Sequence, residues 1–485
     1  MAKKLENSYL VYTIAILLSL VFISFMRNVD NDPRIKQEES LLHTTLNAAH
    51  GLYQREILKQ VLTTQQNKDE GDHGSKFWTP ISVKNQASKT LSGMQITFCK
   101  LNFAAHSKAP HVTPMFKDLL SKSHCDGNKV VKQYGHIANP DLYNTSLYLP
   151  AERVPIDIPV TGFIFHESRV GSTLAANLFA VDEETLVFSE SAPPPAILLH
   201  CSGCPRKSIV EKFRAVVQLM CKSTYHKRCI FKMQSITVSM IDIVLDAFPN
   251  VPWIFLYRQP VETMMSHAKS DNMINANCLR SKRRGDERVS SGLTVKEVVQ
   301  RILTSKEAGS NSLSVSHEAW CAAHLDMLCW FALEAEKTFG RYRDHQRSRR
   351  GFLLPYESLP GAIPKIIFPL FGINASEFTA EWSQKMQSTS MQYSKSRLSF
   401  RGNFKEDSSK KNKLASAEVK RWAEKIMLPT FYTMKDLSRR AVEDLLSTHA
   451  IWDVGTLQIL QRKTFDSNLA NTSWAWMAPL TVLKN

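Results

Sequence analysis

The chain lacks the sequence signatures of several common nucleotide-binding and nucleic-acid-binding proteins. It has no GxxxxGK[ST] motif, so no P-loop lysine is available to reach a β- or γ-phosphate, and it has no obvious Walker B run of apolar residues ending in Asp. Zinc-finger spacing, an RNP motif and a basic helix interleaved with aromatic residues are also absent. The 61 Lys and Arg residues nevertheless outnumber the 45 Asp and Glu residues, which gives a formal net charge of +16. These absences argue against nucleic acid as a partner and leave a solvated basic surface or an anionic ligand.

One segment, residues 161–180, has the sequence TGFIFHESRVGSTLAANLFA. The apolar run Thr161–Phe165 predicts a buried parallel strand, His166–Thr173 a small polar loop, and Leu174–Ala180 a helix. A strand, a loop of small residues and a helix in this order direct backbone N–H groups and the positive end of the helix dipole toward a phosphate. The segment therefore predicts an anion-binding loop.

The loop contains residue types that suit an anion. Gly171 lets the backbone approach closely, Ser172 and Thr173 provide hydroxyl donors, and Arg169 provides a fixed positive charge.

A second strand-and-helix segment, residues 251–266, has the sequence VPWIFLYRQPVETMMS. Trp253–Tyr257 is another run typical of a buried strand, and it ends at Arg258. Pro260 is favourable at the start of a helix, and Ser266 follows Arg258 by eight residues. This segment would place a positive charge and a hydroxyl at the end of a second strand.

Together the two segments resemble the sulfotransferases that use 3′-phosphoadenosine-5′-phosphosulfate (PAPS). In that family the first loop binds the 5′-phosphosulfate, which here implies Ser168, Arg169, Val170, Gly171, Ser172 and Thr173. The Arg at the second strand end and the Ser eight residues on bind the 3′-phosphate, which implies Arg258 and Ser266. A later basic loop, residues 398–413, resembles the loop that closes over the 3′-phosphate, through Arg401 and Gly402; a plain surface loop is the alternative.

The resemblance implies transfer of a sulfuryl group from PAPS to a hydroxyl of a glycan, a protein tyrosine or a small alcohol, with no metal required. Many members have a lysine in the first loop; this chain has Arg169, which stabilises charge but is a poor proton donor. Lys232 ends a strand where cytosolic members have Lys-x-His, and Gln234 replaces that His. Lys232 would contact the sulfuryl group.

Glu190 is the candidate general base, because it follows the predicted strand Thr185–Phe188. We expect this strand to lie next to Gly162–Phe165, since consecutive strands usually neighbour each other, so that Glu190 faces the same crevice as the loop. A helix-capping or salt-bridged Glu is the alternative. Lesser candidates near the two segments are His166, Glu167 and His267.

Two other functions fit parts of this pattern. A nucleotide kinase or NTPase would use the same strand–loop–helix arrangement, although the GK[ST] signature is missing. A non-catalytic membrane-anchored binding protein could keep the fold without the transfer reaction.

Strand-like and helix-like runs alternate from about residue 156 onward, which predicts an α/β fold with a central parallel sheet flanked by helices. Ser316 is a candidate N-cap for a helix that ends at Gly340, and Ser416 for a later helix. Residues 271–315 interrupt the pattern as an exposed insertion, which serves as a solvated loop or as an acceptor-binding loop. The predicted strands are Gly162–Phe165, Thr185–Phe188, Cys229–Lys232, Trp253–Tyr257 and Phe352–Pro355.

An uncharged run, Ser8–Met26, is long enough to span a bilayer and follows two lysines. It predicts a signal anchor and a single-pass type II membrane protein with its body in the Golgi lumen; a cleaved signal peptide is the alternative. The predicted organisation is a cytosolic tail (1–7), a transmembrane anchor (8–26), a stem (27–85), a lead-in without a clear period (86–155), the catalytic domain (156–440) and a C-terminal extension (441–485).

Nine cysteines and three N-x-[ST] sequons, at Asn144, Asn374 and Asn471, fit a body in the secretory pathway. Several cysteines would then pair, and the odd number leaves at least one unpaired within the chain or available to another chain. Cys201 and Cys204 have CxxC spacing, for which a local disulfide is favoured over a zinc site.

Overall fold

The computed structural model describes residues 76–84, 91–122, 125, 129–138, 147, 154–200, 204–268, 273–274, 276–306, 315–341, 349–374, 379–392, 394 and 407–448. All of these residues belong to one compact unit, His73–Asn485. The other unit, Met1–Asp72, lies outside the described residues.

The predicted localisation as a type II Golgi membrane protein has to be corrected. Within the described ranges, the helices are all too short or too polar to span a bilayer. The run Ser8–Met26, on which that prediction was based, lies outside the described residues, as do Asn144, Asn471 and the loop residues Arg401 and Gly402.

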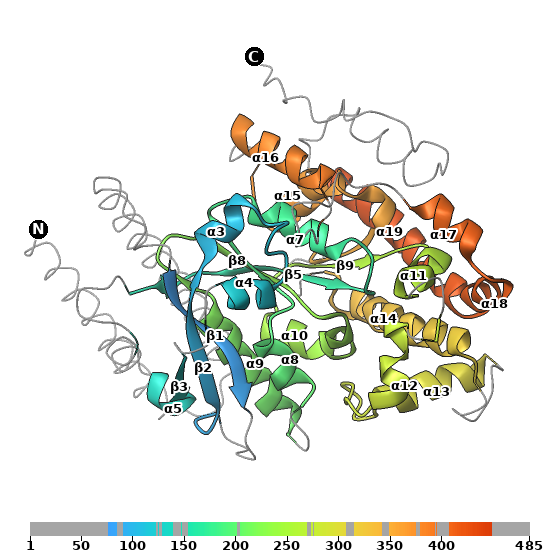
Figure 1. The fold of residues 1–485 in the computed structure, drawn as a ribbon, viewed down its shortest axis with the longest axis horizontal. Coiled ribbons are helices and arrows are strands. Elements are labelled where there is room, and N and C mark those ends of the chain that lie inside the picture. The colour runs from blue at the N-terminus through green and yellow to red at the C-terminus, as the bar shows by residue number, and fades with distance from the viewer. Residues whose placement is uncertain are drawn as a thin grey trace, which may run out of the picture. The chain divides into compact units, whose positions relative to one another are not determined.

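A parallel five-stranded sheet forms the centre of the unit, in the order β10-β9-β5-β8-β6. Its strands β8, β5 and β9 are labelled in Figure 1. This confirms the predicted central parallel sheet flanked by helices. Each predicted strand is present with the same or slightly wider bounds, because runs of apolar residues buried on both faces leave few alternatives. The strands are β5 (Val160–His166), β6 (Thr185–Ser189), β8 (Arg228–Lys232), β9 (Trp253–Tyr257) and β10 (Gly351–Pro355).

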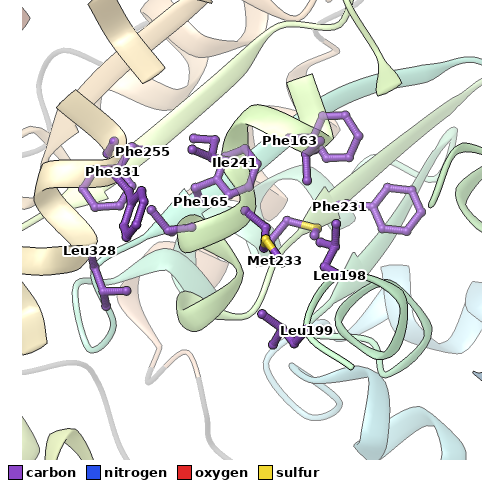
Figure 2. Packing of buried hydrophobic residues seen from close by; sticks show 14 of the residues in the cluster. Phe163, Phe165, Leu198, Leu199, Phe231, Met233, Ile241, Phe255, Leu328 and Phe331 are labelled. Carbon is purple, nitrogen blue, oxygen red and sulfur yellow. The ribbon is translucent and has the colours of Figure 1, made fainter. Parts of the chain in front are cut away.

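The two faces of the sheet carry different side chains. Successive residues of a strand point to opposite faces, so Phe163 and Phe165 of β5 lie on one face and Ile164 between them lies on the other. The first face is rich in aromatic rings, and Figure 2 shows Phe163, Phe165, Phe231 and Phe255 in this core with Ile241 and Phe331 from the covering helices. The second face is mainly aliphatic.

Helices cover both faces. On the aliphatic face lie α7 (Ser172–Ala180), α15 (Phe368–Leu370) and α16 (Ala380–Met391). On the aromatic face lie α8 (Pro193–Leu198), α9 (Arg206–Met220), α10 (Ile241–Ala247) and α14 (His317–Phe339) (Figure 1). Ser316 caps α14 as predicted, since its hydroxyl accepts a hydrogen bond from the Ala319 N–H at 3.1 Å.

Further helices follow β9 and β10 along the chain. They are α11 (Pro260–His267), α12 (Arg280–Arg284), α13 (Val295–Ser305), α17 (Ser408–Leu414), α18 (Ala417–Trp422) and α19 (Leu428–Thr448). Ser416 caps α18 as predicted. The predicted insertion is therefore folded in part, because α12 and α13 lie within it beside α14 (Figure 1).

The expectation that Thr185–Phe188 lies directly beside Gly162–Phe165 is wrong. The strand β8 is inserted between β5 and β6, and it pairs in parallel with both. The chain passes through α7 to the edge strand β6 and returns through α8 and α9 to fill the gap. All five strands are still parallel, so their carboxyl ends meet at one edge of the sheet.

A second, antiparallel sheet precedes the parallel sheet along the chain, with the order β1-β2-β3. It consists of β1 (Lys76–Lys84), β2 (Gln95–Asn102) and β3 (Val130–Gln133). The disulfide Cys99–Cys125 ties β2 to the segment before β3. β1 packs against α8 and α9, so residues from the predicted stem and lead-in complete the aromatic core.

Two further disulfides, Cys221–Cys229 and Cys278–Cys321, lie in the main body, and Cys204 is also disulfide-bonded. Cys329 is a buried free thiol among the described cysteines. The prediction that several cysteines pair as disulfides is confirmed for the bonded residues.

Candidate functional site

The loop after β5 has an unusual backbone. Ser168 and Arg169 have φ angles of 91° and 60°, and Gly171 has 77°. Across the described residues, the non-glycine residues with positive φ are Ser168, Arg169 and Glu190. Such a conformation costs on the order of 1–3 kcal/mol per residue and is concentrated at functional sites. All three residues follow the carboxyl ends of strands β5 and β6.

Gly171 allows a close approach to the segment after β10. A Cβ atom at this position would lie 2.9 Å from the ring of Tyr356 and 3.0 Å from Leu359. Glycine is therefore required both by the space and by the left-handed backbone.

The N-terminus of α7 has no side-chain cap. Its first backbone hydrogen bond runs from the Ala175 N–H to the Gly171 carbonyl at 3.1 Å. The N–H groups of Ser172, Thr173 and Leu174 precede this bond and have no carbonyl one turn back in the helix. The helix begins two residues earlier than predicted, so the two hydroxyl residues of the loop form its first turn. This arrangement suits an anion.

The structure brings the two predicted segments into contact. The Arg169 side chain is exposed, and its Nε donates a hydrogen bond to the Ser266 carbonyl at 3.1 Å. Ser266 lies in the last turn of α11, which follows β9, the direct neighbour of β5. The Ser266 hydroxyl donates to the Glu262 carbonyl at 2.7 Å within the helix.

Arg258 is buried and is surrounded by acceptors. Its Nε donates to Glu262 Oε2 at 2.7 Å, and its Nη2 donates to Asp407 Oδ1 at 3.2 Å and to Ser408 Oγ at 3.1 Å. The guanidinium also stacks over the Tyr356 ring, 4.0 Å from the ring centre. An anion that binds Arg258 would have to compete with Asp407 and Glu262.

Lys411 completes the group around Arg258. Its Nζ lies 2.8 Å from Asp407 Oδ2, and burial together with the Arg258 charge lowers the pKa of Lys411 despite this contact. Two cations and two carboxylates therefore neutralise one another at the start of α11 and α17.

Glu190 lies at the carboxyl edge as expected, although β8 separates it from β5. Its carboxylate forms an ion pair with Lys232, whose side chain is fully buried, while 26% of the Glu190 side chain is exposed. His166 Nε2 is 3.7 Å from the same carboxylate oxygen. The Glu190 N–H donates to the Lys232 carbonyl at 2.8 Å, which fixes its backbone. One carboxylate oxygen is thus held while the side chain still reaches solvent.

Two lesser candidates are buried beneath the loop. Burial raises the pKa of Glu167 to about 8, opposed by the hydrogen bond from the Arg258 N–H to its carboxyl group at 3.2 Å. Burial lowers the pKa of His267 to about 3, and the neighbouring His324 and Arg169 lower it further. Both side chains are therefore neutral near pH 7, and neither faces the solvent.

The sequence did not point to the carboxylates around Arg258. Glu262 had a local signal, because it stands four residues after Arg258 at the start of a predicted helix. Asp407 had none, since it lies far along the chain and comes close only through the packing of α17 against α11.

Among the described residues, no group of three or more His, Cys, Asp or Glu side chains is arranged to hold a metal ion.

No protein-family model matches the chain, and no curated protein matches it in sequence. Solved structures that it resembles include a sulfotransferase from Alicyclobacillus acidocaldarius (9% identity, 47% of this chain and 90% of that chain, TM-score 0.26). Others are sulfotransferase STF9 from Mycobacterium avium (11%, 61% and 78%, 0.33) and the sulfotransferase domain of the curacin biosynthetic pathway (14%, 56% and 98%, 0.26). With TM-scores this low, the case for a function rests on the geometry of the site.

Proposed function

We propose that this protein is a PAPS-dependent sulfotransferase that transfers a sulfuryl group to a hydroxyl of an acceptor. The observation that carries the proposal is the backbone of the candidate site. Three non-glycine residues with positive φ, Ser168, Arg169 and Glu190, lie at the edge of the sheet where ligands of open α/β folds bind. Ser168 and Arg169 directly precede the uncapped N-terminus of α7, and Arg169 contacts Ser266 of α11, the helix that follows Arg258.

The residues present fit the two phosphate groups of PAPS. The open N–H groups at the start of α7, the Thr173 hydroxyl and the exposed Arg169 suit the 5′-phosphosulfate. Arg258 and Ser266 suit the 3′-phosphate, provided that the Asp407 carboxylate moves away from Arg258. Arg401 and Gly402 belong to this proposal only through their resemblance to the loop that closes over the 3′-phosphate.

At sulfur, the transfer makes one bond and breaks one bond. The acceptor oxygen attacks sulfur, the bond from sulfur to the 5′-phosphate oxygen breaks, and adenosine 3′,5′-bisphosphate leaves with the electron pair. Arg169 and the α7 N–H groups stabilise the charge on the leaving phosphate. Glu190 accepts the acceptor proton, for which its partly exposed carboxylate is suited.

Lys232 has two roles in this scheme. Its ammonium group holds one oxygen of Glu190, which fixes the direction of the carboxylate. It also supplies positive charge beside the transferred sulfuryl group. Burial lowers the pKa of Lys232, and the charge of Glu190 opposes this shift.

A nucleotide kinase or NTPase remains the main alternative, with a non-catalytic binding protein as the second. Thermal stabilisation separates a sulfotransferase from a kinase or NTPase. For a sulfotransferase, we expect adenosine 3′,5′-bisphosphate to raise the Tm more than ATP with Mg²⁺ does. Transfer of label from PAPS, screened over glycans, tyrosine peptides and small alcohols, separates an enzyme from a binding protein. Greater stabilisation by ATP with Mg²⁺ would contradict the proposal.

A further inference from the structure

The segment from residue 276 to residue 306 is a strongly basic element. It contains eight Lys and Arg residues against three Asp and Glu residues, a net charge of +5. Its exposed basic side chains are those of Arg280, Arg283, Arg288, Lys296 and Arg301. Arg280, Arg283 and Lys296 form no ion pair with any carboxylate of the described residues.

The segment is held rigidly on the rest of the protein. The disulfide Cys278–Cys321 joins it to the second turn of α14, and Lys282 Nζ donates to the Val315 carbonyl at 2.9 Å. Thr294 and Glu297 form a capping box at the start of α13. A solvated loop requires none of these connections.

Two connections link the segment to the candidate transfer site. The Ser290 N–H donates to the Ser239 carbonyl at 3.1 Å, and Ser239 lies in the 3₁₀ turn η2 (Ser235–Met240), which begins three residues after Lys232. The segment also follows α11, whose Ser266 carbonyl accepts from Arg169. It therefore spans between the ends of β8 and β9.

A connected path leads from the loop to the basic side chains through α14. The charges of His324 and Arg169 both lower the pKa of His267, and His324 stands one turn after Cys321. Cys321 and Cys278 have Cα atoms 5.1 Å apart, and Arg280 follows Cys278 by two residues. The loop and the basic side chains are therefore linked through α14 and this disulfide.

The chemistry of this surface favours a polyanion recognised by its charge. Between residues 276 and 306, no large apolar side chain is exposed among the described residues. Docking of a peptide generally uses side-chain pockets or an open strand edge, and this surface consists of two short helices with spaced cations. Arg280 and Arg283 lie on the same face of α12, three residues apart.

We propose that the α12–α13 segment is a docking site for an acidic polysaccharide, which it presents as the acceptor to the transfer site. The acceptor role rests on the proposed function; the binding of the polysaccharide does not. Attraction of this kind is screened by salt.

The test compares two double charge reversals in the full chain. Arg280→Glu/Arg283→Glu changes the proposed site. Lys227→Glu/Lys337→Glu makes the same change in charge near the amino ends of the strands. Lys227 directly precedes β8. Lys337 lies two residues before Phe339, whose carbonyl accepts a hydrogen bond from the ring N–H of Trp253, the first residue of β9. The probes are a heparin oligosaccharide, poly-L-glutamate and neutral dextran, each at about 0.05 and 0.2 M salt.

We expect the Arg280→Glu/Arg283→Glu variant to bind heparin roughly tenfold more weakly, with a smaller dependence on salt, while the Lys227→Glu/Lys337→Glu variant changes less than about twofold. Equal losses in both variants would show that only the overall charge matters and would overturn the proposal. Binding of poly-L-glutamate as tight as that of heparin would overturn it in favour of an acidic peptide. Affinity for adenosine 3′,5′-bisphosphate is measured in parallel. If the wild type does not bind this nucleotide, the proposed function is wrong, while the result for the polysaccharide is unaffected.

Discussion

The two halves of the candidate nucleotide site differ in how their charges are satisfied. The loop after β5 is open, with an exposed Arg169 and an uncapped helix N-terminus. The element after β9 is closed, because Arg258 is buried and holds Glu262, Asp407 and Ser408. The first half is organised before a ligand arrives, at the expense of backbone strain. The second half has to exchange a protein carboxylate for a ligand phosphate.

This difference explains why the two halves would respond differently to substitution. In the open half, a substitution alters the loop geometry or removes a charge, and no neighbouring side chain compensates for the loss. In the closed half, the loss of Arg258 leaves Glu262 without its ion-pair partner and Asp407 with Lys411 alone, and the loss of Asp407 leaves Lys411 without its partner.

The largest effect is expected at Glu190, beside the open half. Glu190→Gln keeps the size of the side chain but removes its basicity, so kcat should fall by about 10²–10⁴ while affinity for adenosine 3′,5′-bisphosphate stays near that of the wild type. Steady-state kinetics with PAPS and titration calorimetry measure the two quantities. A fall in kcat of less than about threefold would rule out Glu190 as the base.

The same variant needs a control for stability, because it leaves Lys232 buried without its partner. Glu190→Gln/Lys232→Met removes both charges and should recover much of any loss in Tm without recovering activity. Recovery of activity in the double variant would show that the single substitution had acted through folding.

Gly171→Ala should weaken binding of adenosine 3′,5′-bisphosphate roughly ten- to hundredfold, because the methyl group meets Tyr356 and the left-handed backbone disfavours alanine. Gly372→Ala is the matched control: Gly372 has a φ of +71°, and no atom lies within 4 Å of the place that its new methyl group would occupy. Both variants lose stability through strain, and only the first should lose affinity. Similar affinities for the two variants would remove the loop from the site.

Arg258→Ala should reduce affinity for the same bisphosphate by tenfold or more, the equivalent of about 1.5–3 kcal/mol for a charge-assisted contact. Asp407→Asn should change it in the opposite direction, by a few fold, since the phosphate no longer competes with a carboxylate for Arg258. Calorimetry at constant ionic strength measures both. Weaker binding in Asp407→Asn would contradict the picture of a carboxylate that has to be displaced.

A dependence of stability on pH is expected through Glu167. Burial raises its pKa in the folded protein to about 8, above the usual value of 4.5, so the folded state keeps a proton that the unfolded state releases. Stability should therefore fall as pH rises from about 4.5 to about 8, by about 1.4 kcal/mol per unit at most. Buried histidines with lowered pKa values oppose this trend below pH 6.5, which leaves pH 6.5–8 as the informative window.

Urea unfolding of the wild type and of Glu167→Gln across that window isolates the effect of Glu167. The difference in stability between the two proteins should change steadily with pH. A difference that is constant from pH 6.5 to pH 8 would mean that Glu167 is already ionised.

The strands of the main sheet could be predicted from the sequence because each is a short apolar run buried on both faces. Their order could not be, since the position of β8 depends on how α8 and α9 pack after the chain has reached β6. The antiparallel sheet was missed for a local reason. β1 contains Pro80, and its register shifts between Pro80 and Ser82, which interrupts the alternation typical of a strand.

For the site, local spacing was sufficient to single out the loop and the pair Arg258 and Ser266, and the contact between Arg169 and Ser266 supports their grouping. The partners of Arg258 could not be predicted from local spacing, because Asp407 and Ser408 are distant from it in the sequence. Backbone strain at Ser168, Arg169 and Glu190 is likewise a property of the folded chain, and the residue types at these positions do not predict it.

If the two halves bind two phosphates of one nucleotide, a cycle of two ligands and two proteins will show it. The wild type and Arg258→Ala are titrated with adenosine 3′,5′-bisphosphate and with adenosine 5′-phosphate, which lacks the 3′-phosphate. Removal of the 3′-phosphate should cost the wild type roughly tenfold or more in affinity and should cost the variant almost nothing. Equal losses in both proteins, or no preference of the wild type for the bisphosphate, would contradict it.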